Sequence, residues 1–404
     1  MKILAIETSC DETAISIINA RGGFSAPKFT ILSNQLFSQA SIHAKYGGVF
    51  PKIAKREHSK SLVPLLNLTL EEAKLLTKTT KPLLFSEKEE LFYQKTLSHE
   101  YELLDQFLFF IKNTKKPKID AIAVTAGPGL EPALWVGINF AKALSHAWDI
   151  PIVPVNHMEG HIMASLLDKS QKDDEVSIPK VNFPVLALLI SGGHTELVIM
   201  KDWLTYKILG STRDDAVGEA YDKVARMLKM PYPGGPHISE LSESVPDGSS
   251  RYKLPRPMLH SDDFDFSFSG LKTAVLYTVK KIPRLTKKIK AEIANEFENA
   301  VVEVLLKKTM RAAQKYKVKT VLIGGGVSAN KRIREQFKNN VAQLPNTDFY
   351  VPKQELSTDN GLMIAVSAYF RSLAYLRKEK PAKANILKED KKKAALAADG
   401  NLSL

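Results

Sequence analysis

The sequence predicts an α/β protein built from two related lobes that face a cleft. Two observations carry this prediction. Short apolar runs typical of buried strands alternate with stretches of helical spacing, and one order of elements occurs twice. In this order a strand, a polar or glycine-rich turn and a second strand come first, and a strand, a glycine turn and a helix follow. With 404 residues, 44% of them hydrophobic, the chain can bury a core in each lobe.

The first copy of this order begins at the N-terminus. A polar loop joins its first two strands, and its third strand ends in a Gly-Pro-Gly turn that leads to a helix. The expected elements are strands at 2–7, 13–18 and 119–125 and a helix from about 134 to 148.

The second copy has richer glycine turns. Strands at 185–190 and 196–201 flank the turn 191–195, and a strand at 320–323 runs into the glycine turn 324–330 before a helix. Because glycine lets an anion approach backbone N–H groups closely, these turns predict a nucleotide between the lobes. The alternative for each turn alone is a tight connection that requires positive φ.

Polar side chains beside these turns could contact such a nucleotide. Ser191, Gly192 and Gly193 would hold a phosphate or an equivalent oxygen, and the Asn330 amide would read a hydroxyl or ring nitrogen. Asp222 could accept bonds from ribose hydroxyls, although a helical i,i+4 pair with Arg226 explains it equally well. Gly235, in the Pro-Gly-Gly-Pro turn, would let the nucleotide pack against backbone.

The remaining segments complete the expected organisation. The N-terminal lobe comprises 1–155 with 357–375, and the C-terminal lobe comprises 156–356. Residues 70–117, rich in Leu, Lys and Glu, predict an inserted helical hairpin or lid, or a peripheral packing element. Residues 376–404 predict a basic, disordered tail.

The net charge of +13 indicates a polyanionic partner, with nucleic acid the first candidate. Residues 271–291 hold a cluster of lysines and an arginine without any acidic residue. This cluster predicts contact with nucleic acid, and a solvated helix face is the alternative.

The single cysteine, Cys10, allows no intrachain disulfide, which suits the reducing cytoplasm. No apolar run approaches the roughly 20 residues that span a bilayer, and the chain opens directly with a strand-like run. We therefore expect a cytoplasmic protein without a leader or membrane anchor.

His157 and His161 stand four residues apart, just after a strand-like run. On a helix this spacing puts both imidazoles on one face, where they could bind one metal ion. Asp359, before an apolar helix, is the best-placed candidate for a carboxylate ligand, although its position also suits a helix terminus. Two unrelated histidines on a half-exposed helix are the alternative.

Several motifs in this order resemble one family. They are Ile6-Glu-Thr-Ser-Cys-Asp-Glu-Thr13, Asn156-His-Met-Glu-Gly-His161, Ser191-Gly-Gly-His-Thr195, Gly218-Glu-Ala-Tyr-Asp-Lys223, Tyr232-Pro-Gly-Gly-Pro236, Phe266-Ser-Phe-Ser-Gly-Leu-Lys272, Gly324-Gly-Gly-Val-Ser-Ala-Asn330 and Ser357-Thr-Asp-Asn-Gly361. The resemblance is to the tRNA N6-adenosine threonylcarbamoyltransferases, the TsaD family, over residues 1–375 apart from 70–117. It implies the actin/hexokinase-like (ASKHA) fold, with duplicated RNase H-like lobes. It also implies transfer of threonylcarbamoyl from threonylcarbamoyl-AMP to N6 of the adenosine 3′ to the anticodon, in tRNAs that read codons beginning with adenine.

The resemblance also implies roles for individual residues. His157, His161 and Asp359 match the metal ligands, for one divalent metal per subunit, Fe²⁺ first and Zn²⁺ as the alternative. From the chemistry of the transfer rather than from the resemblance, Asp11 or Glu12 could orient the adenine amine or accept its proton, or could merely cap the surface. TsaB-like and TsaE-like partner proteins are expected besides tRNA. The matched substrate-binding positions are Leu189, Ile190, Ser191, Gly192, Gly193, Asp222, Gly235 and Asn330.

Three other functions compete with this interpretation. A metalloprotease of the zincin type carries glutamate directly after the first histidine, but here Met158 fills that place and Glu159 comes one residue late. A nucleotide-dependent kinase or O-carbamoyltransferase of the same superfamily would act without tRNA. A non-catalytic scaffold would bind tRNA in a salt-sensitive way without turnover.

Overall fold

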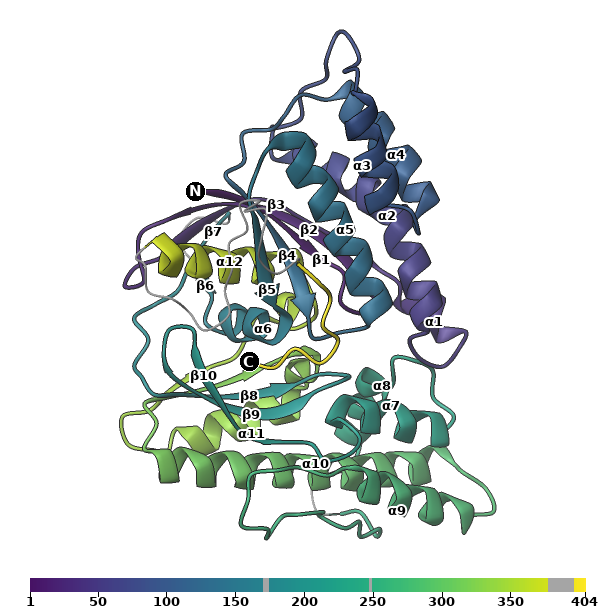
Figure 1. Ribbon diagram of the computed structural model, residues 1–404. Helices are drawn as coiled ribbons and strands as arrows, with labels where there is room; N and C mark the ends of the chain where they lie inside the picture. Colours follow the sequence, from purple (N-terminus) through teal and green to yellow (C-terminus); the bar gives the residue numbers. More distant parts are fainter. Residues whose placement is uncertain (170–173, 247–248, 377–395) are drawn as a thin grey trace. The chain divides into compact units, whose positions relative to one another are not determined.

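The computed structural model describes residues 1–169, 174–246, 249–376 and 396–404 (Figure 1). The chain divides into two compact units. Unit 1 holds residues 1–41, 49–180 and 359–404, and unit 2 holds residues 42–48 and 181–358. No helix of the described residues is long and apolar enough to cross a membrane.

Unit 1 is built on a seven-stranded sheet of order β5-β4-β1-β2-β3-β7-β6. The strands β1, β2 and β3 form an antiparallel meander, and β4 and β5 add in parallel on the other side of β1. The bounds are β1 Lys2–Glu7, β2 Glu12–Arg21, β3 Lys28–Ser38, β4 Ala121–Gly127, β5 Ile152–Asn156, β6 Asp168–Lys169 and β7 Glu175–Ser177. β1 and β4 are buried along nearly their whole length, which explains why their sequences are almost continuously apolar.

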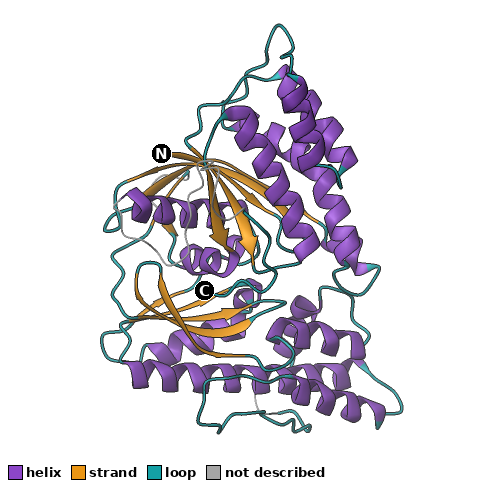
Figure 2. Ribbon diagram, in the orientation of Figure 1, coloured by secondary structure: helices purple, strands orange, loops and turns teal. Residues whose placement is uncertain are grey.

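Helices cover both faces of this sheet (Figure 2). On one face α2 (Pro51–Glu72) and α5 (Glu131–Trp148) pack against each other and against β2 and β4. On the other face α12 (Gly361–Leu376) packs against β1, β2 and the short α6 (His157–Ser165). α12 is apolar almost all round because it lies between the sheet and α6.

Unit 2 repeats the same topology with a five-stranded sheet of order β10-β9-β8-β11-β12. Its meander β8-β9-β10 corresponds to β1-β2-β3, and the parallel strands β11 and β12 correspond to β4 and β5. The bounds are β8 Val185–Ile190, β9 Thr195–Asp202, β10 Thr205–Ser211, β11 Thr320–Gly324 and β12 Asp348–Tyr350. The repeat confirms the predicted α/β fold of two related lobes.

The helices of unit 2 surround a core that contains apolar residues of β8, β9 and β11. The long α10 packs against α8, α9 and α11, and α7 packs against α8 and α9. Their bounds are α7 Val217–Met227, α8 Gly234–Glu243, α9 Ser269–Lys280, α10 Lys287–Tyr316 and α11 Lys331–Val341, with short 3-10 turns η1 at Gly326–Ala329 and η2 at Gln354–Leu356.

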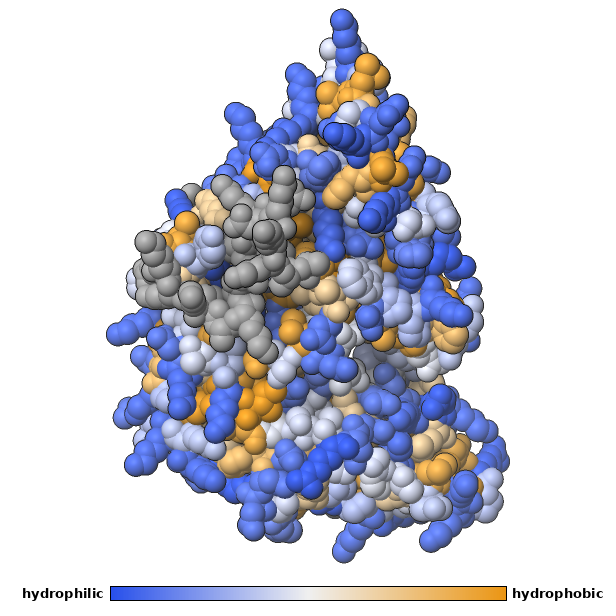
Figure 3. Space-filling model, viewed as in Figure 1, coloured by the Kyte–Doolittle hydropathy of each residue, from blue (hydrophilic) through white to orange (hydrophobic). Residues whose placement is uncertain are grey.

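The inserted segment forms the helices α3 (Glu87–Thr96) and α4 (Tyr101–Asn113), after the short α1 (Ala40–Ala44) and the long α2. α4 buries one apolar face against α2, so the insert belongs to the core of unit 1. Orange apolar side chains lie among the blue polar ones over the insert in Figure 3. The expected helical hairpin is therefore present, although α2 already covers its first residues.

The division of the chain differs from the expected lobe boundary at residue 155. α6, β6 and β7 lie in unit 1, which continues to Lys180. The reason is local: Asn156 ends β5 and at once caps α6, and β7 pairs with β3. On its return to unit 1 the chain crosses the unit boundary at Asp359.

Part of the segment expected as a disordered tail is ordered. Residues 377–395 lie outside the described residues, but 396–404 pack on unit 1. The backbone N–H of Asp399 donates to Ala126 O (2.9 Å), and the Asn156 amide donates to Leu402 O (3.2 Å). Hydrogen bonds and the buried leucine at 396 thus hold these residues against the turn that follows β4.

Candidate functional site

The helix α6 presents the histidine pair. The Asn156 side chain accepts hydrogen bonds from the N–H groups of Met158 (2.8 Å) and Glu159 (3.2 Å), which fixes the start of the helix. Every residue of α6 is buried. His157 and His161 therefore share one inward face, with ring centroids 4.7 Å apart.

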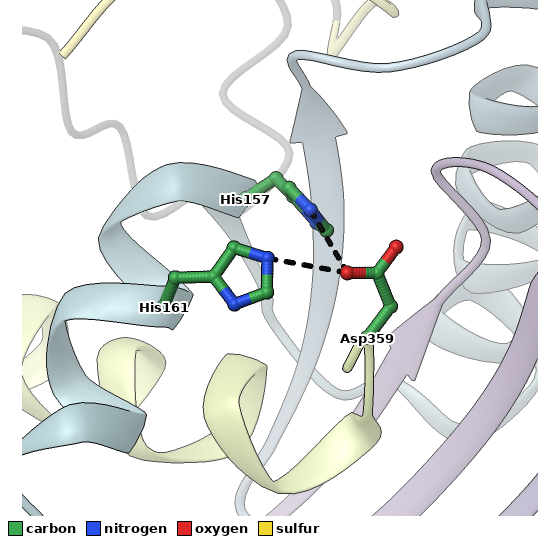
Figure 4. Close-up of side chains that lie close together, drawn as sticks. All are labelled: His157, His161 and Asp359. Carbon is green, nitrogen blue, oxygen red and sulfur yellow. Dashed lines mark ion pairs between the residues drawn. The ribbon is translucent and has the colours of Figure 1, made fainter. Parts of the chain in front are cut away.

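Asp359 comes to this pair from the other end of the chain. Its Oδ1 lies 3.3 Å from Nε2 of His157 and 3.2 Å from Nε2 of His161 (Figure 4). One ligand atom from each of the three residues lies within 4.8 Å of the others. Asp359 is placed there because it lies two residues before the start of α12, which packs against α6.

The three side chains fit a divalent transition metal. Neither ring nitrogen of the buried His161 makes a well-oriented hydrogen bond within the described residues, which is costly unless another ligand uses them. Two imidazoles and one carboxylate are donors that iron and zinc accept, and such a set leaves coordination positions open for substrate or water.

A second layer of polar groups holds His157. Its Nδ1 lies 3.2 Å from Oε2 of Glu7 and 3.1 Å from Oγ of Ser9. Glu7 is fully buried and also accepts bonds from the Ser9 N–H and the Thr125 hydroxyl, each at 2.5 Å. Sequence reasoning missed this carboxylate. The available signal was an acidic residue at the end of an otherwise apolar strand.

The charges around the site shift the pKa values of its members. Burial lowers the pKa of His157, but the carboxylates of Asp359 and Glu7 outweigh burial and raise it well above its usual range. Burial raises the pKa of Asp359, and the two histidines more than offset this and hold it far below its usual range. Asp359 is therefore a carboxylate, the form that binds a cation.

Glu159 does not face the histidines. It forms a two-bond ion pair with Arg371 of α12, with Nε–Oε1 at 2.7 Å and Nη2–Oε2 at 3.0 Å. Glu159 is almost fully buried, and its two oxygens are used by this pair. The pair ties α6 to α12 and thus the histidines to Asp359. A glutamate so engaged is not placed to act as the base of a protease.

The loop between β1 and β2 lies beside the same centre. His58 of α2 fixes it, with Nε2 3.0 Å from Cys10 O and Nδ1 2.7 Å from the Thr13 hydroxyl. Burial, with the charges of Asp11 and Asp359, raises the pKa of Glu12 to about 10. In the metal-free protein Glu12 is therefore protonated at neutral pH and is a proton donor rather than a base.

The predicted glycine turns meet within unit 2. The N–H of Gly218 donates to Ser191 O (3.2 Å), and a Cβ at Gly218 would lie 2.6 Å from that oxygen. Gly325, at φ +88°, approaches Ile190 O so closely that a Cβ would lie 2.4 Å from it. By contrast, a Cβ at Gly192, Gly193 or Gly235 would meet nothing within 4 Å. These three glycines therefore border open space, as a ligand cradle requires.

Asp222 and Asn330 have structural partners in the same cluster. Oδ1 of Asp222 accepts from the Gly234 N–H (2.7 Å) and joins α7 to α8. The Asn330 amide donates to Ser239 Oγ (2.8 Å) and Glu298 Oε1 (2.6 Å), while its oxygen caps α11 at Ile333 N (2.9 Å). Leu189 and Ile190 are buried in β8, so only their backbone could reach a ligand.

Comparison with known proteins decides the family. The model of the family described as TsaD, tRNA N6-adenosine threonylcarbamoyltransferase, matches residues 30–84 and 99–366. The chain belongs to the TsaD family. The gap between the matched segments, residues 85–98, lies within the insert. The insert residues on either side of it, 70–84 and 99–117, belong to the matched segments, so most of the insert is part of the family pattern.

Curated relatives agree with this assignment over the whole chain. A relative from Bacillus cereus is 40% identical over 403 residues, covering 100% of this chain and 96% of its own length. Relatives from Persephonella marina (41%, covering 92% and 90%) and Anoxybacillus flavithermus (39%, covering 100% and 97%) carry the same name, tRNA N6-adenosine threonylcarbamoyltransferase. Among solved structures, full-length HypF is similar with a TM-score of 0.46 and 12% identity, over 68% of this chain and 50% of that chain. The predicted enzyme class, a transferase that modifies tRNA, is confirmed.

Proposed function

We propose that His157, His161 and Asp359 bind one divalent metal that serves threonylcarbamoyl transfer to tRNA. Fe²⁺ is the first choice of ion, and Zn²⁺ is the alternative. The observation that carries this proposal is the approach of both Nε2 atoms to one oxygen of Asp359, at 3.3 and 3.2 Å. TsaD-family membership supplies the reaction: the threonylcarbamoyl group of threonylcarbamoyl-AMP passes to N6 of the adenosine 3′ to the anticodon.

The chemistry explains what the site must provide. The carbonyl of the acyl-phosphate anhydride is electrophilic and AMP is a good leaving group, but the exocyclic amine of adenine is a poor nucleophile. The enzyme must therefore orient the amine and stabilise the departing phosphate. A bound metal supplies a Lewis acid for the carbonyl or phosphate oxygen. Glu7 and Ser9 hold the His157 ring, and Glu159 with Arg371 fixes its helix.

In unit 2 the adenylate is expected on the cradle formed by Leu189, Ile190, Ser191, Gly192, Gly193, Asp222, Gly235 and Asn330. Open space beside Gly192, Gly193 and Gly235 supports this placement, because ligand atoms can pack directly on backbone there. Asn330 and Asp222 shape the cradle through their bonds to Glu298 and Gly234. Their role is therefore to position the cradle at least as much as to contact the nucleotide.

Asp11 and Glu12 are proposed to contact the adenine amine. Asp11 is buried and Glu12 is half-buried, and Glu12 lies close enough to Asp359 for that carboxylate to help raise its pKa. TsaB-like and TsaE-like proteins are the proposed partners, and the cytoplasm, where unmodified tRNA is available, is the proposed location.

The test is a reconstituted transfer reaction. The protein is mixed with threonine, bicarbonate, ATP, a threonylcarbamoyl-AMP synthase, unmodified tRNA and bacterial partner proteins, and modified adenosine is measured by mass spectrometry. His157→Ala should abolish product, while His260→Ala, at an exposed histidine of unit 2, should retain it. Full activity of metal-stripped His157→Ala protein would overturn the proposal, and tRNA binding without product in wild type would favour a scaffold.

A further inference from the structure

We propose that the segment from Tyr277 to Lys290, here called the basic turn, binds the phosphate backbone of the tRNA. This inference rests on the proposed function, because it takes tRNA as the substrate. The basic turn joins the end of α9 to the start of α10 in unit 2 (Figure 1).

The cations of the basic turn are exposed or half-buried, and no ion pair within the described residues involves any of them. They are Lys280, Lys281, Arg284, Lys287, Lys288 and Lys290. Lys272, earlier on α9, shows the contrast, since its Nζ lies 2.6 Å from Asp215 and its charge is thereby satisfied. Unpaired cations on one short segment repel each other, so the cluster is best explained by an anion outside the chain.

The first three acidic residues that follow on α10 turn inward. Glu292, Glu296 and Glu298 are all less than one-tenth exposed. Glu292 pairs with Arg251 at 2.9 Å, and Glu296 pairs with Arg256 at 2.5 Å. At the start of α10 the lysines therefore face outward and the carboxylates face inward. A merely solvated face would mix both signs.

An aromatic side chain stands among these cations. Tyr277 is 60% exposed on the last turns of α9, and Lys280 and Lys281 follow at i+3 and i+4 on the same face. A ring flanked by phosphate-binding charges suits single-stranded RNA, whose splayed bases stack on aromatics. The anticodon loop of tRNA offers such bases, whereas an acidic protein surface would not need the ring.

The test uses the full-length, metal-loaded protein with its partner proteins and unmodified tRNA. One variant carries Lys→Gln at 280, 281, 287 and 288, and a matched control carries Lys→Gln at 201, 207, 319 and 338, exposed lysines of unit 2 outside the basic turn. The tRNA dissociation constant is measured between about 50 and 200 mM salt. The basic-turn variant should bind at least about tenfold more weakly, with a salt slope smaller by about 2–3, since each phosphate contact contributes about 0.7–0.9. The control should change less than about twofold.

Tyr277 and turnover provide independent readouts. Tyr277→Ala should weaken binding without changing the salt slope, and Tyr277→Phe should restore it, because stacking needs only the ring. The basic-turn variant should keep wild-type kcat at saturating tRNA, whereas His157→Ala should bind tRNA normally and fail to turn over. If His157→Ala kept full turnover while the basic-turn variant still bound tRNA weakly, only the proposed metal role would be overturned, and this inference would stand. Wild-type tRNA affinity and salt slope in the basic-turn variant would overturn this inference.

Discussion

Nδ1 of His157 lies 3.2 Å from Oε2 of the buried Glu7, while Nε2 of the same ring faces Asp359 at 3.3 Å. If Nε2 gives its lone pair to an ion, Nδ1 must carry the hydrogen and donate it to Glu7. This carboxylate–histidine–metal arrangement fixes the tautomer and the ring orientation and makes the imidazole a stronger ligand.

Glu7→Gln tests this relationship. The substitution keeps the size of the side chain and removes its charge, so metal affinity should fall by about 10–100-fold while the fold is retained. Isothermal titration of the metal-stripped protein measures the affinity, and Glu87→Gln on the exposed start of α3 is the control. Equal affinities for Glu7→Gln and wild type would show that the carboxylate has no part in holding the ligand.

Glu159 and Arg371 should be coupled. Glu159→Ala removes the carboxylate of a two-bond ion pair with the largely buried Arg371, so the free energy of unfolding should fall by about 3–5 kcal/mol. With Arg371→Met also present, the loss should be smaller than the sum of the single losses by about 1–3 kcal/mol. Chemical denaturation of wild type, the two single variants and the double variant measures the four free energies of unfolding from which the coupling is calculated. Additive losses would mean that the pair does not join α6 to α12.

Glu12 should make the metal-free protein less stable as pH rises. Burial, with Asp11 and Asp359, raises its pKa in the folded protein to about 10, whereas an unfolded glutamate ionises near pH ~4.3. Between these values the folded state binds more protons than the unfolded state, so the free energy of unfolding contributed by Glu12 falls with rising pH. Glu12→Gln should therefore match wild type near pH 4 and be more stable than wild type at pH 8, by up to about 5 kcal/mol.

Denaturant unfolding of both metal-free proteins across this range measures that difference. Glu102→Gln, on an exposed position of α4, serves as the control and should run parallel to wild type. Parallel curves for Glu12→Gln and wild type would contradict the elevated pKa.

Gly193 tests the nucleotide cradle. A Cβ at this position meets nothing within 4 Å, so Gly193→Ala and Gly193→Val should leave the melting temperature nearly unchanged. Side chains there would occupy the space assigned to the adenylate. The KM for threonylcarbamoyl-AMP should therefore rise stepwise, by at least about tenfold for valine. An unchanged KM for both variants would place the nucleotide elsewhere.

The sequence predicted the elements that have a periodic or motif signal. The i,i+4 spacing of His157 and His161 put them on one helical face, and the repeated strand and glycine-turn order predicted two related α/β units. The structure confirms the unit topology, and it brings the side chains of His157, His161 and Asp359 within ligand distance of one another. Only the match to the family motifs could link Asp359 to the histidines in the sequence, because nothing local to Asp359 points to a helix almost 200 residues away.

Other features left no such signal. Glu7 contacts the ring of His157, which lies 150 residues later in the sequence, and no spacing rule links the end of a strand to so distant a helix. Asn330 looked like a free amide beside a glycine turn, but tertiary packing gave it Glu298 and Ser239 as partners. The boundary expected at 155 differed because β7 pairs back onto β3, a pairing that short polar strands do not reveal.

Metal titration of the purified, metal-stripped chain tests the central claim most directly. Fe²⁺ under anaerobic conditions, and Zn²⁺ separately, should bind with a stoichiometry of about one ion per chain. His157→Ala, His161→Ala and Asp359→Ala should each abolish this binding while circular dichroism remains that of the folded protein. Undiminished binding of one ion by the three variants would contradict the assignment of these residues as the metal centre.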